Sequence, residues 1–168
     1  MKTWVEEFKE QSIFRLDENI PRITKCLNEL TEEEIWYSPN KQSNSIGHLI
    51  LHLCGNITQY IHSSLGGAED NRKRNLEFTT TERLSRTALI EKITKVIEKA
   101  KTIVQRCTDA EFLRYRTVQG FNLSGMGIVI HVVEHLSYHT GQITYYTKEL
   151  KNKDLEFYKG QDLDALND

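Results

Sequence analysis

Apolar residues recur every three to four positions over four long segments of this 168-residue chain, which is the period of an amphipathic α-helix. We expect the first helix over about residues 3–30, with a kink or break at Pro21, because proline cannot continue the backbone hydrogen bonds. The second helix is expected from about 43–45 to the glycine pair Gly66–Gly67. The third and fourth are expected over about 87–107 and 124–150.

Shorter segments connect these helices. Thr31 and Thr108 are each followed by acidic residues, which predicts an N-cap and a short helical turn at both places. Residues 114–118 alternate and are expected to be extended, residues 68–85 read as an exposed connection, and residues 151–168 carry no apolar stripe. The pattern predicts an all-α fold: a single four-helix bundle domain over residues 1–168.

Charge and cysteine content narrow the function classes. The net charge is −2 and charges of both signs are interspersed, which argues against a nucleic-acid partner. The apolar runs are too short to span a bilayer, and the acidic N-terminus does not resemble a signal peptide. Three scattered cysteines without a C-x-x-C motif favour reduced, buried thiols in a cytoplasmic protein: Cys26, Cys54 and Cys107.

The histidines are the strongest functional signal. His131, His135 and His139 follow one another at intervals of four in the fourth helix, while the other three lie in the second helix. At about 100° per residue, His135 and His139 fall inside the apolar sector of their helix and His131 lies at its edge. A buried imidazole needs a hydrogen bond or a metal, so two inward histidines facing a second histidine-bearing helix favour a metal site.

The second helix offers a third ligand. His52 flanks the centre of the apolar stripe and is the best candidate, with His48, one turn earlier, as the alternative. His62 lies further round and is expected at the surface. Three neutral imidazoles with an open coordination position suit zinc, nickel or another divalent ion.

Other residues refine this expected site. H-E-x-x-H is absent because Val132 follows His131, and Glu134 points about 100° away from its neighbour His135, so a glutamate general base is not supported. Gln142 and Asn56, each about one turn beyond an expected ligand, are placed to orient ligands or substrate.

Two segments resemble a known family. Residues 44–56 (N-S-I-G-H-L-I-L-H-L-C-G-N) and 131–143 (H-V-V-E-H-L-S-Y-H-T-G-Q-I) are similar to the second and fourth helices of the DinB-like superfamily of four-helix metal-binding proteins, which includes the YfiT-like enzymes. Thr140 stands where the family often has arginine. The resemblance implies an up-down-down-up bundle, a divalent metal held by His52, His135 and His139, and a homodimer. Apolar residues off the main stripes also favour a dimer: Leu51, Val129, Ile130 and Val133.

The resemblance implies a divalent-metal-dependent enzyme that acts on a small-molecule substrate. Its most concrete form is an S-transferase-like reaction, in which the metal lowers the pKa of a low-molecular-weight thiol and holds the thiolate beside an electrophile. One alternative is a metal-dependent hydrolase that uses a metal-bound hydroxide. Another is a non-catalytic metal or small-molecule binding protein.

Overall fold

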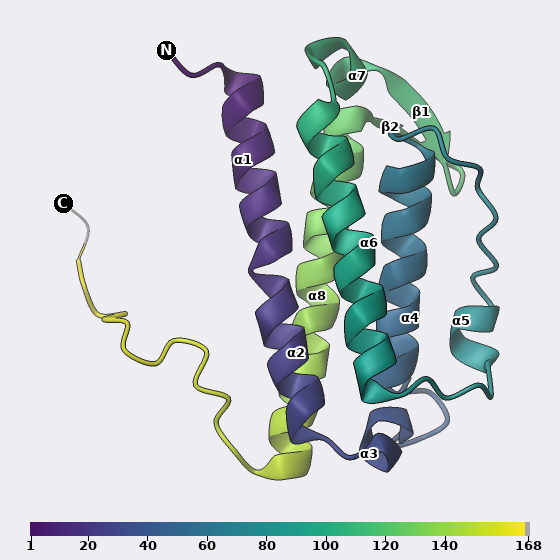
Figure 1. Cartoon of the computed structure of the whole chain (residues 1–168), viewed down its shortest axis with the longest axis vertical. Helices are drawn as coiled ribbons and strands as arrows, with labels where there is room; N and C mark the ends of the chain where they lie inside the picture. The colour runs from purple at the N-terminus through teal and green to yellow at the C-terminus, as the bar shows by residue number, and fades with distance from the viewer. Residues whose placement is uncertain (167–168) are drawn as a thin grey trace.

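Four long helical segments form an elongated bundle in the computed structural model, which describes residues 1–166 (Figure 1). They are α1 (Trp4–Asp17) continued by α2 (Asn19–Glu29), then α4 (Ile46–Ile57), α6 (Arg86–Arg106) and α8 (Gly125–Lys151). The α1–α2 rod and α8 run along the bundle in one direction, whereas α4 and α6 run in the other. The four-helix, up-down-down-up bundle predicted from the sequence is therefore confirmed.

Short elements close the ends of the bundle. They are α3 (Glu32–Trp36), the π-helix η1 (Thr58–Ser63), α5 (Leu76–Thr79), α7 (Asp109–Leu113), β1 (Tyr115–Val118) and β2 (Phe121–Ser124). The two strands form an antiparallel hairpin in which Tyr115 pairs with Ser124. Its turn residues Gln119 and Gly120 both have positive φ, 50° and 81°, as a two-residue hairpin turn requires. The expected extended piece at 114–118 is thus confirmed as β1, while β2 and the π-helix were not predicted.

The first helix breaks near the expected proline. The break lies at Glu18, between α1 and α2, and Pro21 is the third residue of α2. A proline has no N–H to donate to the carbonyl four residues earlier, and its ring clashes with that carbonyl. For Pro21 that carbonyl belongs to Asp17, the last residue of α1, so the interruption lies one turn before the proline.

The predicted caps begin the short helices. The Thr31 hydroxyl accepts the backbone N–H of Glu34, and the Glu34 carboxylate accepts the backbone N–H of Thr31, which completes a capping box. Thr108 caps α7 by accepting the N–H of Glu111. Both segments have the structure that the sequence indicated.

The apolar stripes meet in one core that includes residues from every long helix. The core side chains Leu16, Leu27, Ile57, Ile97 and Ile143 are fully buried. Val129 is also buried within this core, so the expectation that it forms part of a second, outward apolar face is wrong; of the four residues proposed for that face, only Ile130 is largely exposed.

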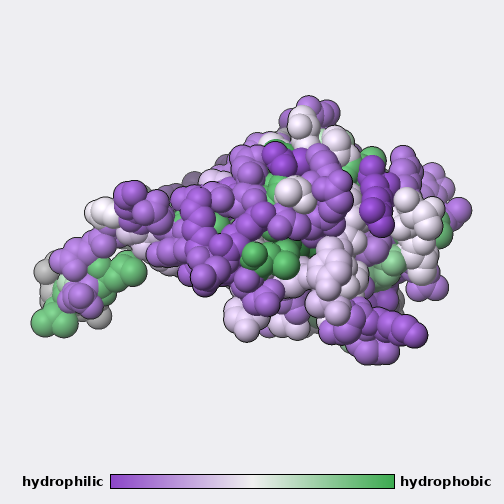
Figure 2. Space-filling view, turned by 90° about the horizontal axis from the view of Figure 1, so that it is seen from below, coloured by the Kyte–Doolittle hydropathy of each residue, from purple (hydrophilic) through white to green (hydrophobic). Residues whose placement is uncertain are grey.

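The end of the bundle at which α3 lies is largely hydrophilic, with small scattered apolar patches (Figure 2). Beyond α8, the C-terminal segment packs through the buried Leu155 and then projects away from the helices. Within residues 1–166, no helix is both long and apolar enough to cross a membrane.

Candidate metal site

Three histidines from two helices converge in the bundle. His52 comes from α4, whereas His135 and His139 lie one turn apart on α8. One nitrogen from each imidazole belongs to a group in which all atoms lie within 4.8 Å of one another. The structure therefore brings together the three residues singled out in the sequence, and no carboxylate or thiol of residues 1–166 joins the group.

Hydrogen bonds on the far side of two rings direct their free nitrogens toward the cluster. Nδ1 of His52 donates to Oε2 of Glu77 at 2.8 Å, and Nδ1 of His139 donates to Oε1 of Gln142 at 2.7 Å. In each ring this leaves Nε2 with a lone pair. Nε2 of His52 lies 2.9 Å from Nε2 of His135. The predicted orienting role of Gln142 agrees with this geometry.

Burial favours the neutral form of two members of the cluster, His135 and His139. His52 is 5 % exposed and His139 is 9 % exposed. Burial, followed by repulsion from the neighbouring histidines, lowers the pKa of His135 to about 3. Burial also lowers the pKa of His139 below its ordinary value, despite the opposing hydrogen bond to Gln142. Neutral imidazoles are the form that coordinates a metal.

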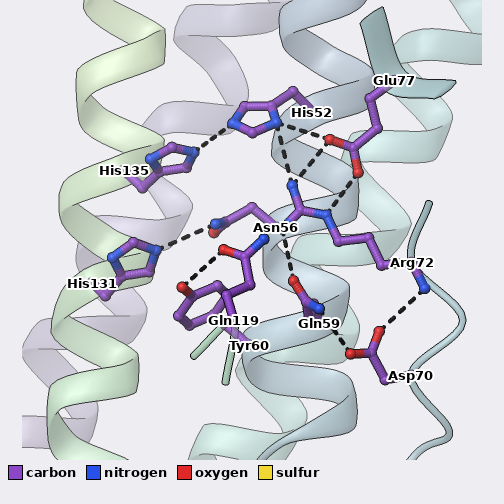
Figure 3. A network of polar contacts seen from close by, with 10 residues as sticks. All are labelled: His52, Asn56, Gln59, Tyr60, Asp70, Arg72, Glu77, Gln119, His131 and His135. Atoms are coloured by element: carbon purple, nitrogen blue, oxygen red, sulfur yellow. Dashed lines mark hydrogen bonds and ion pairs between the residues drawn. The ribbon is translucent and has the colours of Figure 1, made fainter. Parts of the chain in front are cut away.

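Behind His52 lies a network that comes from the connection between α4 and α6 (Figure 3). Arg72 donates hydrogen bonds to both carboxylate oxygens of Glu77, from Nε to Oε1 at 2.7 Å and from Nη2 to Oε2 at 3.0 Å. Arg72 also donates to Oε1 of Gln59 at 2.9 Å, and Gln59 in turn donates to Asp70 at 2.8 Å. The prediction that residues 68–85 are simply an exposed connection is therefore wrong for Arg72 and Glu77, whose side chains are 4 % and 10 % exposed.

The ionised form of Glu77 is favoured. Burial alone would raise the pKa of this carboxyl group, but the hydrogen bonds from His52 and Arg72 and the positive charge of Arg72 lower it below its ordinary value. An ionised carboxylate behind a histidine is a common arrangement at protein metal sites. Sequence reasoning missed Glu77; Gly55, a glycine inside an apolar helix, was the one signal of a close approach at this place.

His131 lies beside the cluster without joining it. Its ring stacks between Tyr60, with centroids 4.2 Å apart, and His135, with centroids 5.4 Å apart. Asn56 donates from Nδ2 to Nε2 of His131 at 3.3 Å. The side chain of Asn56 therefore hydrogen-bonds His131, which corrects the expectation that it orients one of the three ligands, while a role toward substrate stays a prediction.

The remaining histidines of the second helix lie outside the cluster. Nδ1 of His48 pairs with the Ser45 hydroxyl at 2.9 Å and its ring packs on Trp36, so His48 is not the third member. His62 was expected at the surface, which is wrong: it is 5 % exposed and Nε2 donates to the Val96 carbonyl at 2.9 Å. The cause is the π-helix that begins at Thr58, because a π turn advances less per residue than an α turn and rotates His62 toward α6.

A cavity of about 470 Å³ opens onto His139. Gln142, Tyr138, Tyr145 and Tyr146 from α8 form one wall, and the other wall is formed by Pro39, Gln42, Ser43, Asn44 and Leu49. No Asp, Glu, Lys or Arg of the described residues lines it. The position of the family arginine is filled by Thr140, which is buried and donates to the Leu136 carbonyl at 2.8 Å.

Solved structures with this fold come from several proteins. A DinB-like protein of Bacillus subtilis, YjoA, superposes with a TM-score of 0.66 and 18% identity over 90% of this chain and 99% of that chain. YfiT of Bacillus subtilis, described as a probable metal-dependent hydrolase with an unusual four-helix bundle topology, gives 0.70 and 14% over 90% and 92%. A mycothiol-dependent maleylpyruvate isomerase gives 0.63 and 15% over 80% of this chain and 60% of that chain.

The chain thus shares the four-helix-bundle fold of these structural neighbours, which include a DinB-like protein. The chain belongs to the DinB-like family DUF1572, described as a protein of unknown function, whose model matches residues 3–159. No curated protein matches the chain.

Proposed function

We propose that the protein is a divalent-metal-dependent enzyme that transfers a low-molecular-weight thiol to an electrophilic small molecule. The observation that carries the proposal is the convergence of three desolvated imidazole nitrogens within 4.8 Å. His52, His135 and His139 would hold the ion, and zinc or nickel suits this all-nitrogen donor set. A divalent ion supplies Lewis-acid chemistry that lowers the pKa of a coordinating thiol or water.

The surroundings of the cluster favour an external thiol over a cysteine of the chain. All three cysteines are buried. Burial raises the pKa of Cys54 to about 12, so this side chain is not a nucleophile at neutral pH. The reacting thiol must therefore enter from outside, and the cavity at His139 offers it a route.

The residues that line the cavity also indicate which kind of electrophile it can bind. Three tyrosines line it and charged side chains do not, so it suits an uncharged substrate with a flat or apolar body. The phenol oxygen of Tyr146 is buried without a hydrogen-bond partner and is a candidate contact for a substrate oxygen. The similar proteins support two chemistries: the isomerase is mycothiol-dependent, and YfiT is described as a probable metal-dependent hydrolase.

Hydrolysis is the second candidate. A metal-bound hydroxide needs no general base, because the ion itself lowers the pKa of its water. A base-assisted hydrolase has no candidate carboxylate at the cluster within residues 1–166, since Glu77 faces the opposite edge of His52 and Glu134 is exposed to solvent. Hydrolysis would therefore depend on the ion alone, and the thiol dependence of the similar isomerase is what favours thiol transfer.

The test has two stages. Purified protein is first analysed for bound metal and titrated with Zn²⁺ and Ni²⁺ against a chelating indicator. The loaded protein is then assayed with a panel of low-molecular-weight thiols and an uncharged aryl or alkyl halide, and separately with uncharged esters. Thiol conjugation that depends on His52 and His139 supports the proposal, ester cleavage supports the hydrolase, and metal without turnover supports a binding protein. Failure to bind either metal overturns the proposal.

A further inference from the structure

We infer that Glu77 is a positioning residue that fixes the ring and tautomer of His52, and that Arg72 and the missing side chain of Gly55 hold it in place. The inference rests on the proposed function in taking His52 as a metal ligand. It assigns a role in the site to the connection between α4 and α6, whose residues carry no apolar stripe.

Glu77 contacts His52 directly. Oε2 of Glu77 lies 2.8 Å from Nδ1 of His52, on the edge of the ring opposite the cluster. Nη2 of Arg72, which can only donate, also lies 3.3 Å from Nδ1, but the contact with the carboxylate is much shorter. An ionised carboxylate accepts only, so we assign the proton to Nδ1 and the lone pair to Nε2. Nε2 is the atom that lies 2.9 Å from Nε2 of His135, so the contact prepares the nitrogen that faces the other two rings.

Arg72 supports the carboxylate of Glu77. Glu77 has two oxygens and both are engaged by Arg72, whose guanidinium forms the paired contact typical of an arginine–carboxylate bridge. Arg72 is tied in turn to Gln59 of η1, and its backbone N–H donates to Asp70 at 3.1 Å. The carboxylate thus has three hydrogen bonds from two side chains, Arg72 and His52, and Arg72 is itself fixed by Gln59 and Asp70.

The carboxylate of Glu77 occupies space that is open only because Gly55 has no side chain. A Cβ on Gly55 would overlap Oε1 of Glu77 and lie 2.7 Å from its carboxyl carbon, closer than real Cβ contacts. It would also lie 3.1 Å from Nε of Arg72. Gly55 lies one helical turn from His52, on the same face of the helix. Because Gly55 has no side chain, the Glu77 carboxylate can pass over it and reach the imidazole ring.

Two alternative roles fit less well. A general base would need to face the side on which His135 and His139 present their nitrogens, and Glu77 faces the other side. A purely structural ion pair between Arg72 and Glu77 would not need a third contact to an imidazole, yet Oε2 is shared between Arg72 and His52. The geometry points to orientation of the histidine.

The experiment measures the tautomer of His52 and the affinity for metal separately. In metal-free, ¹⁵N-labelled protein, the imidazole nitrogen shifts should place the His52 proton on Nδ1. In Glu77→Ala this preference should be lost. The Zn²⁺ dissociation constant, measured by chelator competition, should rise about 10- to 100-fold in Glu77→Ala and Gly55→Ala. Glu77→Gln retains an acceptor oxygen and should fall between these variants and the wild type.

Matched controls separate this role from general damage. Gly141 lies on α8 with open space around its Cβ position, so Gly141→Ala tests a helical glycine-to-alanine change without displacing Glu77. Glu69→Gln removes an exposed carboxylate from the same connection. Both should retain wild-type affinity, and circular dichroism should show a helical fold for every variant.

The outcomes distinguish this inference from the proposed function. Metal binding that is lost in His52→Ala but unchanged in Glu77→Ala and Gly55→Ala would overturn the positioning role while leaving the metal site intact. A wild-type protein whose His52 carries its proton on Nε2 would overturn it without any variant. Absence of metal binding in the wild type would overturn the proposed function, whereas the tautomer measurement would still decide the role of Glu77.

Discussion

Nε2 of His52 and Nε2 of His135 lie 2.9 Å apart although 83 residues separate them along the chain. Two neutral nitrogens with facing lone pairs repel each other unless a proton or a cation lies between them. At zinc–nitrogen bond lengths of about 2.0–2.1 Å, two ligands of one tetrahedral ion lie about 3.3 Å apart, so a small outward shift of the rings makes room for the ion.

Removal of a cluster histidine should abolish metal binding but preserve the fold. In His135→Ala or His139→Ala, two donors remain where a stable site needs at least three, while the buried apolar stripes are unchanged. Elemental analysis of the purified variants should show loss of the ion, and circular dichroism should show an unchanged helical content. Full metal occupancy in His135→Ala would mean that the site lies elsewhere.

His62→Ala should have the opposite effect. The change removes the hydrogen bond to the Val96 carbonyl and leaves that buried acceptor unsatisfied, which should cost about 1–3 kcal/mol of unfolding free energy. His62 does not belong to the three-histidine group, so its metal content should equal that of the wild type. Denaturant unfolding and elemental analysis on the same preparation check both halves of this expectation.

Metal should stabilise the folded protein. An ion that binds only the folded state at a concentration one hundred times its dissociation constant adds about 2.7 kcal/mol. For a chain of this size the melting temperature should rise by roughly 5–10 °C. A thermal melt with added Zn²⁺ and with a chelator measures the shift, and the same shift in His139→Ala would contradict the proposed ligands.

Acid should destabilise the metal-free protein. Burial lowers the folded-state pKa of His131, His135 and His139, the second to about 3, whereas an unfolded histidine titrates near about 6.5. The unfolded chain therefore binds more protons below pH about 6.5, and stability that is complete above this value is lost as the pH falls toward the folded-state pKa values.

Chelator-treated protein tests this direction by melting at pH 7 and pH 5. The melting temperature should be lower at pH 5, and His135→Ala should show a smaller drop than the wild type because it lacks the most strongly shifted group. A melting temperature that rises on acidification would contradict the assignment of neutral imidazoles.

A homodimer stays a prediction, and one residue of the expected apolar face is open to a partner. Ile130 on α8 is 52 % exposed, whereas Val129 is buried. Light scattering should report twice the 19.6 kDa chain mass at micromolar concentration, and Ile130→Glu should shift the mass toward one chain. A wild-type monomer would contradict the prediction.

The sequence predicts the parts of this structure that follow a regular period. The long helices, the caps at Thr31 and Thr108, and the inward phase of His135 and His139 all depend on local spacing, and each agrees with the structure. His52 could be chosen over His48 because it lies beside the buried stripe of α4. These inferences need no knowledge of how distant segments pack.

The errors arise where the period changes or where a loop folds back. No proline or glycine marks the start of the π-helix at Thr58, so the burial of His62 could not be derived from an α-helical phase. The contact between Glu77 and His52 depends on the path of an irregular connection over Gly55, which no local pattern encodes. The role of Asn56 was misplaced because its partner is a stacked histidine on another helix.

The neighbouring helices α4 and α6 run in the same direction along the bundle. Because these neighbouring helices run in parallel, the chain must travel back along the whole bundle between them, whereas an alternating bundle would need only a tight turn (Figure 1). Residues 64–85 are this return path, and Arg72 and Glu77 lie on it. A redesign that shortened the path into a hairpin would retain all three histidines yet lose the carboxylate behind one of them. The length of this segment therefore determines whether the carboxylate reaches His52. Insertions should be tolerated at its exposed residues 67–69 far better than between Arg72 and Glu77.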